Sequence, residues 1–138
     1  MRVMAIDYGD ARTGIAISDA LGTICGTAFT LALRDPEQLA ERIAAECSGR
    51  GVAALVLGLP KNMDGSEGER AKHTREFARL LTEHTGLEPV LWDERRTTVE
   101  AHAILHANGK RAIHHKKNVD AVAAALILEA YLGTLPVA

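Results

Sequence analysis

Four acidic residues stand where elements of secondary structure are expected to end or begin. Asp7 closes one apolar run, Asp93 and Glu94 close another, and Asp120 lies near the start of an apolar segment. Carboxylates brought together from separate segments repel one another, and a hard cation such as Mg²⁺ or Mn²⁺ offsets that repulsion. An ion held in this way can activate water and stabilise the leaving oxygen in phosphodiester cleavage. These acids are therefore candidates for a metal-dependent catalytic site.

Each acid also has an ordinary structural explanation. Asp7 could cap a turn before Gly9, and the pair Asp93–Glu94 could belong to a solvated charged loop. Asp120 could simply complement the dipole of a helix in its first turn. The catalytic interpretation is stronger for the three positions together, because ends of elements can converge on one edge of a sheet.

The apolar pattern around two of the acids indicates the direction in which they point. On the two-residue period of a strand, Asp7 shares a face with Val3 and Ala5, which are expected to be buried. The segment around Asp120 is apolar nearly all round, as in a buried helix, and Asp120 begins a line that continues through Ala124. A carboxylate in line with buried side chains needs hydrogen bonds or a cation.

Positive charge gathers in the last third of the chain, although the net charge is −2. Between positions 95 and 117 there are six lysines and arginines and one acid, Glu100. A phosphate backbone is attracted by the local charge of a surface rather than by the net charge of the chain. The segment is therefore a candidate for nucleic-acid binding, and the alternative is a solvated loop. The candidate phosphate contacts are Arg12, Lys61, Arg95, Lys110, Arg111, Lys116 and Lys117. The polar stretch 61–66 is expected to be a substrate flap or a long connection.

The expected elements follow the order βββαβαβαα. Strands are expected over 3–8, 13–18, 23–31, 52–57 and 89–92. Four helices are expected. The first runs from Asp35-Pro36 to Ser48-Gly49, and the second from a capping box of Ser66 with Glu69 to a point before Gly86. The third runs from a capping box of Thr97 with Glu100 to Asn108-Gly109, and the fourth from about 118 to a point before Gly133. This order predicts a five-stranded mixed sheet, an antiparallel three-strand meander plus two parallel strands, flanked by helices.

Length and composition favour one domain over 1–138 that folds without disulfides. The two cysteines have no metal-binding spacing and are expected to be reduced thiols, as in the cytoplasm. Neither a signal peptide nor a membrane span is expected, because no apolar run is long enough.

Four segments resemble the motifs of the YqgF family, also called RuvX, whose members are described as Holliday junction resolvases and pre-16S rRNA nucleases. They read AIDYGDARTGIAISD at 5–19, GLPKNMDGSEG at 58–68, WDERRTT at 92–98 and KNVDAVAAALIL at 117–128. The resemblance covers the whole chain, with the motifs in order and at matching spacing. It implies a ribonuclease H-like fold and a cytoplasmic metal-dependent nuclease acting in pre-16S rRNA 5′-end processing, Holliday junction resolution or both.

Carried over by motif, Asp7, Glu94 and Asp120 would be the catalytic metal ligands for Mg²⁺ or Mn²⁺, with Asp93 the less certain neighbour. The strand beside the first one ends in Gly58-Leu59-Pro60, where many nucleases of the superfamily carry an acid, so one or two metals remain possible. The implied partner is an RNA precursor or branched DNA, bound by a monomer or homodimer. The alternatives are a non-catalytic nucleic-acid adaptor and an ATP-binding domain like those of the actin and sugar-kinase superfamily.

Overall fold

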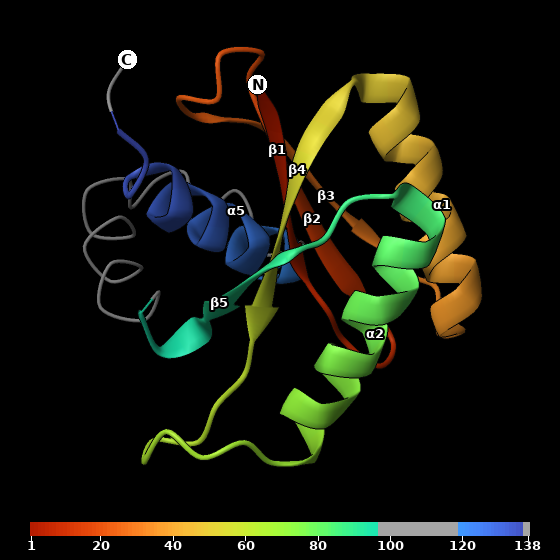
Figure 1. Cartoon of the computed structure of the whole chain (residues 1–138), viewed down its shortest axis with the longest axis vertical. Coiled ribbons are helices and arrows are strands. Elements are labelled where there is room, and N and C mark those ends of the chain that lie inside the picture. Colours follow the sequence, from red (N-terminus) through yellow and green to blue (C-terminus); the bar gives the residue numbers. More distant parts are fainter. Residues whose placement is uncertain (97–118, 137–138) are drawn as a thin grey trace.

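The computed structural model describes residues 1–96 and 119–136. Five strands form one mixed sheet in the order β3-β2-β1-β4-β5, with helices on both faces (Figure 1). The strands are β1 (Arg2–Asp7), β2 (Thr13–Ser18), β3 (Cys25–Leu31), β4 (Val52–Leu59) and β5 (Val90–Asp93). The helices are α1 (Pro36–Arg50), α2 (Glu69–Thr85) and α5 (Val119–Leu132).

Strand pairing confirms the expected mixed sheet. β1, β2 and β3 form the antiparallel meander, while β1 pairs with β4, and β4 with β5, in parallel. Parallel strands need a crossover, and α2 supplies the one between β4 and β5. The carboxyl ends of β1, β4 and β5 therefore meet at one edge of the sheet. The helix expected between Thr97 and Asn108 lies outside the described residues.

Local hydrogen bonds explain where the structure departs from the expected helix ends. Asp35 caps α1 by accepting a bond from the Gln38 amide, as predicted, but α1 runs past Gly49 and ends at Gly51, whose φ is +68°. The capping box at Ser66 does not form. Its amide donates to Asp64 instead, and α2 begins after Gly68 without a side-chain cap.

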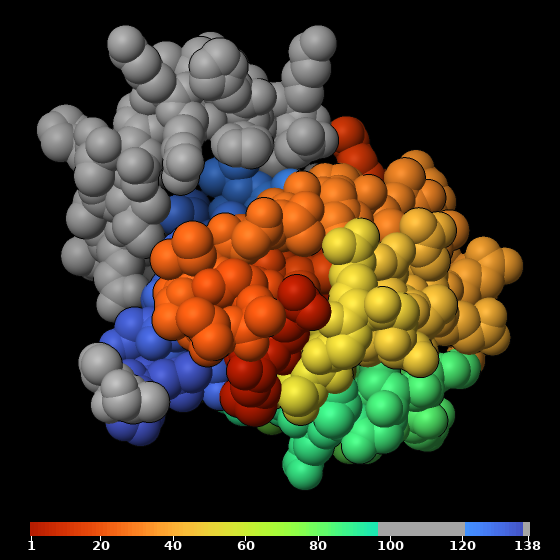
Figure 2. All heavy atoms as spheres, turned by 90° about the horizontal axis from the view of Figure 1, so that it is seen from above, coloured from red at the N-terminus to blue at the C-terminus, as the bar shows by residue number. Residues whose placement is uncertain are grey.

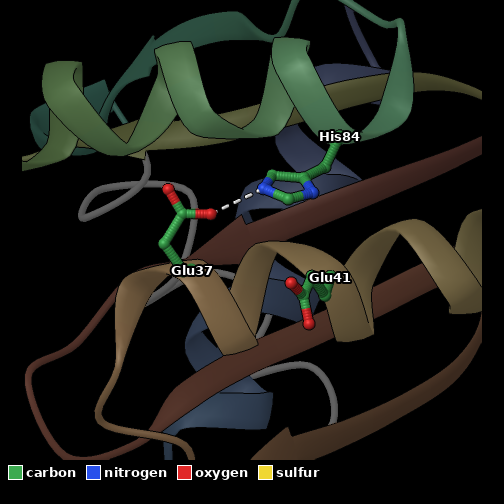
Figure 3. Close-up of side chains that lie close together, drawn as sticks. All are labelled: Glu37, Glu41 and His84. Atoms are coloured by element: carbon green, nitrogen blue, oxygen red, sulfur yellow. Dashed lines mark hydrogen bonds and ion pairs between the residues drawn. The ribbon is translucent and has the colours of Figure 1, made fainter.

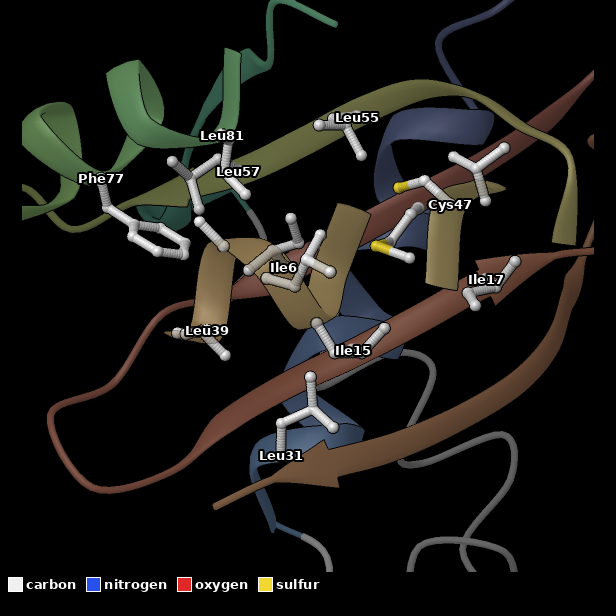
Figure 4. Close-up of a cluster of buried hydrophobic side chains, with 14 residues drawn as sticks. Ile6, Ile15, Ile17, Leu31, Leu39, Cys47, Leu55, Leu57, Phe77 and Leu81 are labelled. Carbon is white, nitrogen blue, oxygen red and sulfur yellow. The ribbon is translucent and has the colours of Figure 1, made fainter. Parts of the chain in front are cut away.

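The face covered by α1 and α2 is built from large aliphatic side chains (Figures 1 and 4). Alternate residues of the strands point into this layer, and Phe77 and Leu81 of α2 close it. Tyr8 extends it beyond β1 by stacking on Phe77, with 4.2 Å between the ring centroids. Burial of a single large apolar side chain of this kind contributes roughly 1.5–3 kcal/mol, so this layer is a major source of stability.

The opposite face, which we call the α5 face, is lined by small side chains. Ala5, Ala16 and Ala28 lie side by side across β1, β2 and β3. Small residues on the sheet allow a helix to approach closely, and α5, itself rich in alanine, packs there with Ala124 and Ile127 buried. α5 has 14 residues, and no helix within the described ranges is long and apolar enough to cross a bilayer.

The end of the molecule opposite the carboxyl ends of β1, β4 and β5 is formed by the start of β1 and the turn between β2 and β3. Figure 2 looks onto this end, with the start of the chain in red beside the β2–β3 segment in orange. The terminal amine of Met1 donates to the Ala20 carbonyl at 2.9 Å and ties the turn to β1.

Candidate active site

Asp7 is the last residue of β1 and belongs to the α5 face. Alternation along β1 places Asp7 on the side of Val3 and Ala5, which pack against α5, as the sequence predicts. Its neighbour across the antiparallel pair is Gly14, which has no side chain to crowd the carboxylate. Asp7 is half-buried, so the chain has a carboxylate at the rim of an otherwise apolar layer.

Glu94 reaches the same face from β5 because Gly58 leaves room for it. Gly58 pairs with Trp92, whose side chain is buried against α5. A β-carbon at position 58 would lie 2.6 Å from Glu94 Oε1 and 2.8 Å from Ile127 Cδ1. The carboxylate of Glu94 therefore lies over the backbone of β4, next to α5.

The register of β1 and β4 brings Asp7 close to this position. Ile6 and Leu57 form the last registered pair, so Asp7 and Gly58 are the residues that follow on adjacent strands. Neighbouring strands lie about 4.8 Å apart. Since Glu94 Oε1 lies against Gly58, the residues Asp7, at the end of β1, and Glu94, directly after β5, both lie at the carboxyl edge of the α5 face.

Asp93 belongs to a different arrangement from Glu94. It follows Trp92 on the alternation of β5 and so faces the side covered by α1 and α2. Asp93 Oδ2 accepts a hydrogen bond from Arg95 Nη2 at 2.6 Å, and Oδ1 accepts from the Arg95 amide at 3.0 Å. The bonds from the Arg95 side chain hold the pKa of Asp93 below its usual range. Of the two adjacent acids, Glu94 is the one on the side of Asp7.

Asp120 is the second residue of α5, the helix that covers this face. Its side chain lies outside the described part of the chain. The other end of α5 is fixed by Glu129, which accepts a hydrogen bond from the Cys25 amide at the start of β3. Nine residues of helix span about 13 Å, so the backbone of Asp120 lies well away from that end. Ala124 and Ile127, on the line that Asp120 begins, are buried as expected.

Three predicted phosphate contacts come from loops at the carboxyl edge. Arg12 is exposed in the turn after β1, where the close approach of its carbonyl to Gly9 leaves no room for a β-carbon at that glycine. Lys61 follows β4, and Arg95 follows β5 but is already bound to Asp93. The other four, Lys110, Arg111, Lys116 and Lys117, lie outside the described residues.

Gly58 belongs to the candidate site, and the sequence pattern indicated this position only by the absence of an acid. A glycine inside or at the end of a strand often indicates a close approach of another group, and that signal was available. The structure shows which group approaches: the Glu94 carboxylate.

A second cluster of possible ligands lies elsewhere, between α1 and α2 (Figure 3). Ligand atoms of Glu37, Glu41 and His84 lie within 4.8 Å of one another, and His84 Nε2 is 2.8 Å from Glu37 Oε2. Glu37 is in the first turn of α1 and His84 in the last turn of α2. The contact between His84 and Glu37 therefore links the two helices at these ends.

Comparisons with known proteins agree with the fold and with the resemblance of the motifs. The family model for RuvX, described as Holliday junction resolvase, matches residues 1–134. A relative from Acetivibrio thermocellus, named "Putative pre-16S rRNA nuclease", is 43% identical over 136 residues, which cover 97% of this chain and 96% of that protein.

Two solved structures share the fold at low sequence identity. RuvC of T. thermophilus in complex with a Holliday junction substrate matches with a TM-score of 0.64 and 11% identity over 97% of each chain. The Fowlpox virus resolvase bound to Holliday junction DNA matches with a TM-score of 0.59 and 10% identity, over 97% of this chain and 98% of that one. With the fold, the motif order and the full-length match in agreement, the chain belongs to the RuvX family of Holliday junction resolvases.

Proposed function

We propose that this chain is a divalent-metal-dependent nuclease that hydrolyses phosphodiester bonds in structured nucleic acid, with Asp7, Glu94 and Asp120 as the metal ligands. The observation that carries the proposal is that Glu94 Oε1 lies against Gly58, the residue beside Asp7 on the adjacent strand. Carboxylates placed at the carboxyl edge, where such folds bind ligands, are suited to hold a cation.

The donor set fits a hard cation. The proposed ligands are carboxylate oxygens, without the nitrogen or sulfur that would select zinc, so Mg²⁺ or Mn²⁺ is the expected ion. Asp7 and Glu94 are half-buried, which limits the water that competes for them. When bound, such an ion lowers the pKa of water and neutralises charge on the leaving oxygen.

The chain's own residues would hold the ion and orient the substrate. Asp7 and Glu94 would keep their negative charge at fixed points of the sheet edge, and α5 behind them excludes water from one side. Arg12, Lys61 and the basic segment 110–117 would hold the phosphates of the substrate. Hydrolysis adds water across one P–O bond and leaves a phosphate monoester on one product and a hydroxyl on the other.

The substrate class is structured nucleic acid. The relative is named as a nuclease of the 16S rRNA precursor, and the two structural neighbours are bound to Holliday junction DNA. Both present phosphates in a fixed shape, and phosphate contacts carry no sequence information directly. We propose cleavage of one or both, in preference to unstructured strands.

Parallel cleavage assays test the proposal. Labelled four-way junction DNA, a 16S rRNA precursor fragment, uninterrupted duplex DNA and single-stranded RNA are each incubated with the protein in Mg²⁺, in Mn²⁺ and in excess EDTA. The proposal predicts cleavage of a structured substrate that depends on the ion. Binding without cleavage in any metal would favour a nucleic-acid adaptor, and full activity in EDTA would rule out the metal.

A further inference from the structure

The loop between β4 and α2, residues 60–68, projects beyond the carboxyl edge of the sheet (Figure 1). Its own hydrogen bonds give it a defined shape. The Asn62 amide donates to the Ser66 carbonyl at 2.8 Å, and the Gly65 amide donates to the Asn62 carbonyl at 2.9 Å. Asp64 accepts a further bond from the Ser66 amide at 2.9 Å. The loop tip is thus a closed turn rather than an extended connection.

Arg95 braces this loop against β5. Its Nη2 is bound to Asp93, and its Nη1 donates to the Met63 carbonyl at 3.4 Å. The guanidinium also lies against Gly65, where a β-carbon would be 3.3 Å from Arg95 Nη1. The φ of Gly65 is +89°. The loop tip is therefore connected through one arginine to the residue next to Glu94.

The side chain at the tip is apolar and fully presented to solvent. Met63 is 93% exposed, the largest value among the large hydrophobic residues that the structure describes. Its flexible thioether packs readily against irregular apolar surfaces. The charge around it is mixed, because Arg95 is bound to Asp93 and also interacts with Asp64. An apolar tip of this kind suits a partner that offers an apolar face, as an unstacked base does.

We propose that Met63 packs against the exposed face of a base at a branch point or helix end, and that this contact makes the enzyme prefer branched or interrupted nucleic acid. The inference rests on the proposed nuclease function and assigns a specificity-determining residue to it. An apolar wedge must unstack base steps to enter an intact duplex, and this unstacking opposes binding. A branch point already offers an unstacked face, so contact with a single exposed methionine contributes most to the free energy of binding there.

Binding in Ca²⁺, which suppresses cutting, provides the test. A four-way junction carrying 2-aminopurine at the branch and an uninterrupted duplex are titrated with wild type, Met63→Ala, Met63→Leu and Leu21→Ala. Leu21 is the matched control, since it is 80% exposed in the β2–β3 turn at the opposite end of the molecule. Circular dichroism checks that each variant is folded.

The expected result is a loss confined to the junction. Met63→Ala should weaken junction binding about fivefold, on the scale of one contact between a thioether and an aromatic ring, and should reduce the change in 2-aminopurine fluorescence. Duplex binding should stay unchanged, Met63→Leu should restore junction binding, and Leu21→Ala should behave as wild type.

The outcomes separate this inference from the proposed function. If Met63→Ala retains both the junction preference and the fluorescence change while wild type cleaves in Mg²⁺, the role of Met63 is wrong and the nuclease stands. Equal losses on junction and duplex would also overturn it, since the contact would not report branching. If wild type cleaves nothing, the nuclease fails, and the Ca²⁺ titrations still decide whether Met63 contacts nucleic acid. Absence of all binding would overturn both.

Discussion

Gly58 leaves the space that the carboxylate of Glu94 occupies, because a β-carbon at position 58 would lie 2.6 Å from Glu94 Oε1. We predict that Gly58→Ala lowers cleavage by about a hundredfold, since a displacement of about 1 Å in a catalytic group can cost that much. The fold should survive, because the atoms in the way are the flexible ends of Glu94 and Ile127. Single-turnover cleavage and thermal unfolding measure the two effects.

Gly49→Ala is the matched control for this substitution. Gly49 lies near the end of α1, where a β-carbon would have no other group within 4 Å. Alanine there should leave cleavage unchanged and stabilise the helix by up to about 1 kcal/mol. If both variants cleave at the wild-type rate, the space above Gly58 does not matter for catalysis.

Removing one proposed metal ligand should abolish most activity without unfolding the protein. Asp7→Asn, Glu94→Gln and Asp120→Asn should each reduce cleavage by about a hundredfold or more, on the order of losing one group that stabilises the transition state. The fold should survive each change, because asparagine and glutamine keep the size of the acid that they replace, and thermal unfolding measures this. Asp93→Asn should lose less activity than Glu94→Gln, and the reverse order would reassign the ligand.

The bond between Asp93 and Arg95 should stabilise the protein in a pH-dependent way. The pKa of Asp93 is lowered in the folded state, chiefly by its hydrogen bonds from Arg95. Its contribution is therefore fully present above the unfolded value of 3.8 and is lost as the pH falls through the lower folded value. Wild type should resist urea better than Asp93→Asn at pH 7, and the difference should shrink as the pH falls below 3.8. A difference that stays constant below pH 3.8 would exclude this origin.

The basic segment should control affinity more than chemistry. Lys116→Ala with Lys117→Ala removes two proposed phosphate contacts, so the slope of log affinity against log salt should flatten by about 1.4–1.8. Cleavage at saturating substrate should remain. The control is Lys72→Ala with Arg79→Ala, which removes equal charge from exposed positions of α2. Salt titrations in Ca²⁺ measure both pairs, and equal slopes for the two would move the substrate path elsewhere.

Both cysteines should react slowly in the native protein. Burial raises the pKa of Cys25 and of Cys47 to about 11. At pH 8 the thiolate, which is the reactive form, should be about a hundredfold scarcer than for an unperturbed thiol with a pKa of 9.0. Alkylation by iodoacetamide at pH 8 should therefore be slow until urea unfolds the chain. Rapid labelling of the native protein would contradict the buried environment.

Much of the fold follows from local patterns in the sequence. Alternation along β1 predicted that Asp7 shares a face with Val3 and Ala5, and the α5 face shows this arrangement. The cap at Asp35 was predictable too, because an N-cap depends on residues only a few positions apart. The Ser66 capping box has the same local signature but fails, since Asp64 competes for the Ser66 amide within a loop whose shape is set by its ends.

The sequence by itself determined the order of the described elements, the face of the sheet to which Asp7 belongs and, through its four motifs, the family. It could not determine which acid of the pair Asp93–Glu94 turns toward Asp7, nor why β4 carries a glycine at position 58. Tertiary structure decided both: Arg95 binds Asp93 on one face, and Gly58 admits Glu94 on the other. The physical reason is that periodicity depends on neighbours along the chain, whereas the space beside a carboxylate depends on residues that only the register of parallel strands brings together.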